Sequence, residues 1–260
     1  MSLEQVDNIV SKLIKESKPY AWVMGEFSQV EELKDFELDL EILELLGITF
    51  HLGKNNILSL KTRTNKIKEQ IFCVVDIEST GGINSGKILE IGAVKIQNHK
   101  ELERFESFVK VDEIPPNITE LTGIELAMVK DSPNLIQVLE AFRLFLGDSI
   151  FVAHNVKFDY NFISKSLYEC GFGILLNRRI CTIDFAQCCI ENSHYGLDAL
   201  KEILKIESTH HRALNDALAA AEIFKYCLGK LPSHIKTTEE LIHFTKTAKL
   251  KNKCYNKKHK

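Results

Sequence analysis

The stretch Ile71-Phe-Cys-Val-Val-Asp-Ile-Glu78 places five consecutive apolar residues directly before two carboxylates. An unbroken apolar run of this length is typical of a central strand that is buried on both faces of a sheet. Because side chains alternate across a strand, Asp76 and Glu78 point to one side while Ile77 points to the other. Two like charges this close are costly to bury unless a cation neutralises them, and a hard divalent metal prefers oxygen ligands. The stretch therefore predicts a buried strand that ends at a metal site; the alternative is a strand that simply ends in two solvated acids.

From residue 70 onward, expected strands and helices intermix along the chain. Three further apolar runs predict strands at residues 88–96, 102–109 and 150–153. Helical periodicity predicts helices at residues 118–121, 135–146, 158–169, 182–190, 197–204 and 212–228. This mixture indicates an α/β domain with a mixed sheet, which we place at residues 70–230.

The first 69 residues differ in character from this domain. An amphipathic helix is predicted at residues 3–16, a weaker helical stretch at 30–36 and a stronger one at 38–46. Two strand-like runs around the turn Gly53-Lys-Asn-Asn56 then predict a hairpin. Helices followed by a basic hairpin resemble a winged-helix module, and a small helical cap packed on the main domain is the alternative. Residues 231–260 are expected to form a helical, basic tail.

Charge and cysteine content narrow the class of protein. The formal net charge of −3 does not indicate a nucleic-acid binder. Residues 54–68 and 246–260 nevertheless carry basic residues and no acid, and such segments either contact phosphates or remain solvated. The seven cysteines form no CxxC pair, which argues against a disulfide framework and a structural zinc site. With no signal-peptide pattern and no apolar run of ~20 residues, we expect a cytoplasmic protein without a membrane span.

A second polar segment, His154-Asn-Val-Lys-Phe-Asp159, follows the apolar run at residues 150–153. His154 and Asn155 stand at the carboxyl end of that expected strand, where sites form in open α/β sheets. Asp159 stands about one turn into the next helix, where an ordinary acid favoured by the helix dipole is the alternative.

A third segment, His211-Arg-Ala-Leu-Asn-Asp216, leads into an alanine-rich helix. If His211 and Asp216 were both helical, five residues would separate their side chains by about 140° around the axis. His211 is therefore expected in a loop ahead of the helix if both side chains serve one metal centre. By itself, an aspartate on such a helix is usually a surface residue.

Taken together, these segments resemble a known family. Phe72-Cys-Val-Val-Asp-Ile-Glu-Ser-Thr-Gly81 and the two segments above are similar to the three exonuclease motifs of the DnaQ-like, DEDDh family, which includes the proofreading epsilon subunit of bacterial DNA polymerase III. The stretches at residues 88–94 and 118–124 also resemble family segments, and the resemblance covers about residues 71–229. One departure is Ser79, where many members carry Thr. In the doublet His210-His211, it is His211 that stands five residues before Asp216, as the family pattern requires.

The resemblance implies a ribonuclease H-like fold, with a mixed five-stranded sheet flanked by helices, and a set of site residues. It assigns two divalent ions, Mg²⁺ or Mn²⁺, to four carboxylates, and the role of general base to His211. The expected metal ligands are Asp76, Glu78, Asp159 and Asp216, with Asp76 as the bridging ligand. The expected substrate-binding or supporting residues are Ser79, Thr80, Gly81, Glu90, Leu121, His154, Asn155 and Phe158, although core packing is an alternative role for Leu121 and Phe158.

The implied reaction is hydrolysis of single-stranded DNA from its 3′ end to mononucleotides, in proofreading or repair. The DNA polymerase III alpha subunit is the expected protein partner. Three alternatives remain: an exoribonuclease that acts on RNA ends, since the motifs do not address the 2′-OH; a non-catalytic nucleic-acid-binding adaptor; and a protein whose main activity is DNA binding by residues 1–69.

Overall fold

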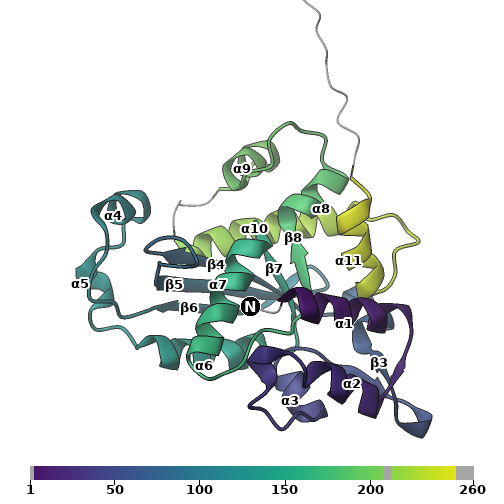
Figure 1. Cartoon of the computed structure of the whole chain (residues 1–260). Coiled ribbons are helices and arrows are strands. Elements are labelled where there is room, and N and C mark those ends of the chain that lie inside the picture. The colour runs from purple at the N-terminus through teal and green to yellow at the C-terminus, as the bar shows by residue number, and fades with distance from the viewer. Residues whose placement is uncertain (1–2, 208–211, 250–260) are drawn as a thin grey trace, which may run out of the picture.

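The computed structural model describes residues 3–207 and 212–249, and a mixed five-stranded sheet forms its centre (Figure 1). The strand order is β6-β5-β4-β7-β8. The central strand β4 pairs antiparallel with β5 and parallel with β7. The strands are β4 (Phe72–Ser79), β5 (Ile88–Gln97), β6 (Lys100–Phe108), β7 (Ile150–Ala153) and β8 (Arg179–Cys181). The expected mixed sheet is therefore confirmed, and β8 is a strand that no sequence pattern indicated.

Helices cover both faces of this sheet, and each face has its own core. The helices are α6 (Leu135–Leu146) and α7 (Val156–Glu169) on one side, and α8 (Thr182–Cys189), α9 (Leu197–Leu204), α10 (Ala213–Leu228) and α11 (Thr238–Thr247) on the other. Val75 of β4 packs with Phe142 and Tyr160 in the first core. Its neighbour Val74 packs with Phe224 in the second. Burial on both faces explains why the stretch at residues 71–75 is apolar throughout.

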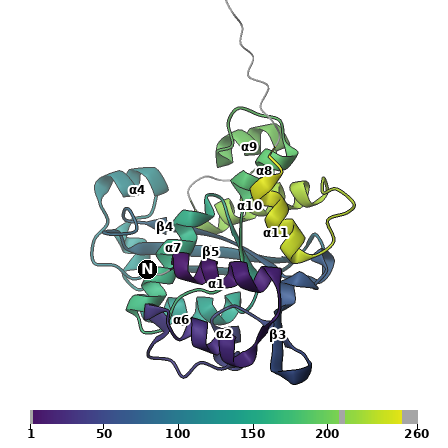
Figure 2. The ribbon, with the colours of Figure 1, turned by 45° about the vertical axis from the view of Figure 1, so that its right-hand side comes forward.

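Two short helices form an arm that stands off the sheet (Figures 1 and 2). They are α4 (Pro116–Thr122) and α5 (Leu126–Val129). As expected from the sequence, α4 ends at Gly123, which adopts a left-handed conformation with φ 68°. A small cluster that includes Leu89, Ile124 and Val129 attaches the arm to β5.

Residues 3–69 form three α-helices, short 3₁₀ turns and a second, three-stranded sheet. Its elements are α1 (Leu3–Lys15), β1 (Lys18–Pro19), α2 (Tyr20–Phe27), η1 (Glu31–Leu33), α3 (Leu40–Leu45), β2 (Phe50–Leu52), η2 (Lys54–Asn56), β3 (Ile57–Leu60), η3 (Lys61–Arg63) and η4 (Ile67–Glu69). The expected hairpin is present as β2 and β3, and β1 pairs with the other side of β3. The strand β1 and the helix α2 were not predicted.

One helical expectation in this region is wrong. The stretch at residues 30–36 forms only the 3₁₀ turn η1, followed by one further turn. Its apolar residues Val30, Leu33 and Phe36 are three apart, a spacing that aligns side chains in a 3₁₀ helix rather than in an α-helix. The backbone bonds agree, because Leu33 N donates to Val30 O and Phe36 N donates to Leu33 O.

The N-terminal elements pack directly on the α/β domain. Their core shares one cluster with Ile174 and Leu176, which lie just before β8. The Leu176 amide donates to the Leu46 carbonyl at 2.7 Å. Arg179 pairs with Asp7 of α1 at 2.6 Å. In the described part of the chain, no helix is long and apolar enough to cross a membrane.

Candidate active site

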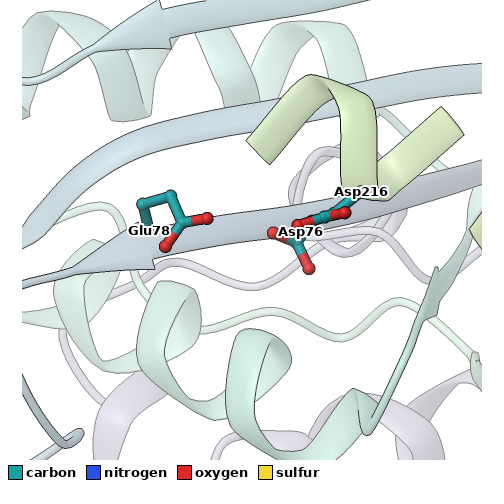
Figure 3. A group of neighbouring side chains, drawn as sticks. All are labelled: Asp76, Glu78 and Asp216. Atoms are coloured by element: carbon teal, nitrogen blue, oxygen red, sulfur yellow. The ribbon is translucent and has the colours of Figure 1, made fainter. Parts of the chain in front are cut away.

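Three carboxylates from two elements meet at the end of the central strand (Figure 3). Asp76 and Glu78 lie on β4, and Asp216 lies in the first turn of α10. One oxygen of each lies within 4.8 Å of one oxygen of the other two. Strand alternation therefore places two acids on one face, and the helix on that face supplies the third.

A glycine allows α10 to approach the sheet this closely. Gly92 of β5 pairs with Asp76 in the strand register. A Cβ atom on Gly92 would lie 2.1 Å from the backbone nitrogen of Leu214 and 2.2 Å from the carbonyl carbon of Ala213. Glycine inside a strand commonly marks a close backbone approach. Gly92 lies within the family-like segment at residues 88–94, and its place inside an apolar strand is the sequence signal for this close approach.

Asp159 adjoins this cluster from the other side of β4. It lies on α7 and is only 3% exposed. Its Oδ1 accepts a hydrogen bond from the Ile77 amide at 3.2 Å, between the two acids of β4. Asp159 is not among the three carboxylates that converge within 4.8 Å, but its charge acts directly on Asp76. Burial, followed by the charges of Asp159 and Glu78, raises the pKa of Asp76 well above its ordinary value.

The acids of the site repel one another strongly. Burial, followed by the charges of Asp216 and Glu90, raises the pKa of Glu78 to about 7, although Arg212 opposes the rise. Burial is also the main cause of the raised pKa of Asp159. Such an arrangement favours protons or a metal cation at the oxygens. Carboxylate oxygens in a convergent cluster suit Mg²⁺ or Mn²⁺, so the residues present fit a divalent ion.

Glu90 holds the beginning of α10. Its side chain is fully buried and stands opposite Glu78 in the strand register. It accepts hydrogen bonds from Arg212 Nη2 at 2.8 Å and from the Ala213 amide at 3.1 Å. Arg212 also pairs with Glu106 and lies over the ring of Phe108. Glu90 thus anchors the helix that carries Asp216.

The remaining histidine and asparagine candidates lie at the junction of β7 and α7. His154 Nδ1 is 2.8 Å from Thr182 Oγ1, and burial lowers the pKa of this histidine to about 4. Asn155 is exposed and adopts a left-handed conformation at the N-cap of α7. His211, the expected general base, lies outside the described residues. The described chain resumes at Arg212, and α10 begins at Ala213.

The loop after β4 uses its polar groups to fold on itself. Ser79 Oγ donates to the Gly81 carbonyl at 2.8 Å, and the Lys87 amide donates to Thr80 Oγ1 at 2.8 Å. Gly86 packs against Gly81 so closely that a Cβ on Gly86 would lie 2.6 Å from the Gly81 carbonyl. The loop is therefore a fixed turn beside the carboxylates.

The two apolar candidates differ in their surroundings. Leu121 projects from α4 and is 56% exposed, so it does not pack in a core. Phe158 is half-buried on α7, with its ring 5.8 Å from that of Phe162.

The sequence profile of a family described as exonuclease matches residues 73–224, a range that contains all four expected metal ligands. The chain belongs to the exonuclease family. Within that family, the DnaQ-like type expected from the motifs is confirmed. This exonuclease is 41% identical to the PolC-type DNA polymerase III of Caldanaerobacter subterraneus over 176 residues, which cover 65% of the chain. It is 36% identical to the enzyme of that name from Staphylococcus epidermidis over 171 residues, which cover 64% of the chain. The matched part is 12% of the length of each of these curated relatives.

Solved exonuclease structures have the same fold. Escherichia coli exonuclease I in complex with a dA16 oligonucleotide matches with a TM-score of 0.57 and 18% identity, covering 63% of this chain and 42% of that one. Exonuclease X in complex with 5′ overhanging duplex DNA matches with a TM-score of 0.52 and 25% identity, covering 67% and 99%. The expected ribonuclease H-like arrangement of sheet and helices is therefore confirmed.

Proposed function

We propose that this exonuclease hydrolyses single-stranded DNA from the 3′ end to mononucleotides with the help of two divalent metal ions, Mg²⁺ or Mn²⁺. The observation that carries the proposal is the convergence of Asp76, Glu78 and Asp216 within 4.8 Å. Membership of the exonuclease family supports the reaction class. DNA as the substrate is supported by the PolC-type DNA polymerase III relatives and by the DNA in the exonuclease X complex.

The chemistry follows from what each residue does. When bound, two divalent ions supply a water nucleophile at neutral pH and charge for the phosphoryl and leaving oxygens. Asp76, Glu78 and Asp216 would hold these ions, and the family resemblance assigns the shared position to Asp76. Asp159 completes the set from α7 and ties its carboxylate to the β4 backbone through Ile77. The family resemblance assigns proton acceptance to His211, a task that suits the imidazole of a histidine.

We propose that the following residues near the carboxylates contact the substrate. The fixed turn Ser79-Thr80-Gly81 contacts the terminal nucleotide at Gly81, which has no side chain, because the Thr80 amide already donates to the Lys87 carbonyl at 2.9 Å. The exposed Leu121 of α4 and the half-buried Phe158 contact its base. Asn155, exposed at the start of α7, contacts the DNA strand. His154 supports the junction of β7 and α7 through Thr182.

The substitution Asp216→Asn tests the proposal. Purified protein with Mn²⁺ is expected to release mononucleotides from 3′-labelled single-stranded DNA, and Asp216→Asn should reduce this release by at least about a hundredfold. Asp148→Asn, which changes an exposed acid before β7, is the matched control and should retain full activity. Wild-type turnover in Asp216→Asn would refute the proposed site. Faster hydrolysis of a matched RNA oligonucleotide would show that the substrate is RNA and not DNA.

We further propose that the protein acts in the cytoplasm beside the replicative polymerase, as a proofreading or repair nuclease. The support is that the similar segment in the relatives is part of a DNA polymerase III. Co-purification of the DNA polymerase III alpha subunit with the full chain tests the partnership. If the alpha subunit is not enriched over an unrelated bait, the protein acts as a stand-alone nuclease.

For residues 1–69 we propose a winged-helix-like module. Residues 70–230 are the proposed exonuclease domain, and residues 231–260 are a tail that contains α11. The support is the set of three helices followed by a hairpin in a small antiparallel sheet. The helix before the hairpin, α3, is unsuited to phosphates because Asp39, Glu41 and Glu44 lie on or beside it. The exposed hairpin tip around Lys54 is the surface left for nucleic acid. Lys54→Glu should weaken DNA binding and reduce its salt dependence, whereas unchanged binding would indicate a packed cap only.

A further inference from the structure

A buried lysine lies beside the proposed metal ligands. Lys201 of α9 is only 5% exposed. Its Nζ lies 3.9 Å from Asp216 Oδ1 and 3.4 Å from Asp198 Oδ1. Lysine is almost never this buried unless its charge is paired, because loss of hydration is costly. Its charge is therefore held against a carboxylate of the active site, and neither the motifs nor the family resemblance gave Lys201 a role.

A second cation near the cluster, Arg212, is bonded to other groups. Arg212 approaches Glu78 closely enough to oppose the rise of its pKa. Its guanidinium, however, is bonded to Glu90, paired with Glu106 and placed over Phe108. Lys201 instead reaches Asp216 from α9, which packs against α10.

We propose that Lys201 is the built-in counter-charge of the metal site, a positioning residue that acts through Asp216. This inference rests on the proposed function, because it requires that Asp216 holds a divalent ion. In the metal-free protein, the ammonium group offsets part of the repulsion among the clustered carboxylates and keeps Asp216 in place. When a divalent cation binds, the same ammonium group repels it. Lys201 thus stabilises the metal-free site and weakens metal binding.

The proposal predicts opposite effects of one substitution in two states of the protein. Lys201→Met keeps most of the apolar stem of the side chain and removes the charge. The metal-free protein should then unfold at a lower temperature, while Mn²⁺ should bind about tenfold more tightly. A lysine that served only for packing would leave the Mn²⁺ affinity unchanged, and its loss would lower the melting temperatures of the metal-free and metal-loaded forms equally.

Two measurements on the full chain test this proposal. Titration calorimetry measures the Mn²⁺ affinity, and thermal unfolding with and without Mn²⁺ measures the stability of the two forms. Lys201→Arg keeps the positive charge and should retain the wild-type affinity. Lys225→Met, on the last turn of α10, is the matched control and should behave as wild type. Asp198→Asn, an exposed change that does not threaten folding, leaves the Lys201 charge less neutralised and should weaken Mn²⁺ binding several-fold.

The outcomes separate the two proposals. One outcome would overturn only the inference about Lys201. In it the wild type binds Mn²⁺, Asp216→Asn does not, and Lys201→Met binds Mn²⁺ with unchanged or weaker affinity. Lys201 is then not a counter-charge, while the proposed metal site stands. If Lys201→Met does not fold, unchanged affinity in Asp198→Asn overturns the inference. If the wild type itself binds no Mn²⁺, the proposed function fails first.

Discussion

Replacing Gly92 by alanine should displace the helix that carries Asp216. The new Cβ would meet the backbone of α10 at 2.1 Å from Leu214 N. Ordinary contact requires about 3.5 Å, so α10 must move away from β5 by roughly 1.4 Å. A backbone atom cannot rotate out of the way as a flexible side chain can, so the whole first turn has to shift. Asp216 lies in that turn and would leave the carboxylate cluster.

The expected cost has two parts that can be measured separately. Overpacking of this kind destabilises a protein by about 1–3 kcal/mol, which urea unfolding measures. A displacement of about 1 Å at a catalytic group costs about a hundredfold in turnover, which the single-stranded DNA assay measures, and calorimetry should show weaker Mn²⁺ binding. Gly25→Ala in α2 is the control, because a Cβ there meets nothing within 4 Å. Wild-type metal affinity and turnover in Gly92→Ala would refute the argument that Gly92 sets the position of Asp216.

Two further predictions concern protons and a buried ion pair. Because the pKa of Glu78 is raised from 4.5 to about 7, its protonation stabilises the folded, metal-free protein below pH 4.5, and this stabilisation is lost as the pH rises through about 7. Melting temperatures across that range, with Glu78→Gln as the comparison, should show a flatter pH dependence in the variant; parallel curves would contradict the prediction. Glu239 pairs with Arg178 at 2.5 Å and accepts from Thr62 at 2.9 Å, with both charged side chains buried. Glu239→Gln should therefore cost about 3 kcal/mol in urea unfolding. Glu31→Gln, in the exposed pair with Lys34, should cost much less, and equal costs would show that burial does not strengthen the Glu239–Arg178 pair.

Local patterns predicted the long elements of the fold well. The helices α6 and α9 have the expected ends, and β7 coincides with its apolar run. Each of these segments is long or apolar enough for its own periodicity to indicate its structure. The strands β1 and β8 have two and three residues, and they exist because β3 and β7 offer them partners. No window of sequence that short distinguishes a strand from a loop.

The candidate site residues also divide into those that local sequence predicts and those that only tertiary contacts bring to the site. Strand alternation alone brought Asp76 and Glu78 together, and the structure places them so. Asp216 joins them only because α10 lies against β5 at Gly92, a contact between residues more than a hundred positions apart. Lys201 sits in an ordinary amphipathic helix, so nothing in its neighbourhood in the sequence distinguishes it from a surface lysine.

The sequence by itself determined the apolar central strand, the two acids at its end and the family to which the chain belongs, because these depend on residues that are close along the chain or on a pattern of motifs. Only the tertiary structure decided which charges face one another. Glu90 anchors α10, Arg212 is bonded to Glu90 rather than to the proposed metal ligands, and Lys201 is buried against Asp216. Coulomb energies depend on distance through space and on burial, and neither quantity is fixed by separation along the chain.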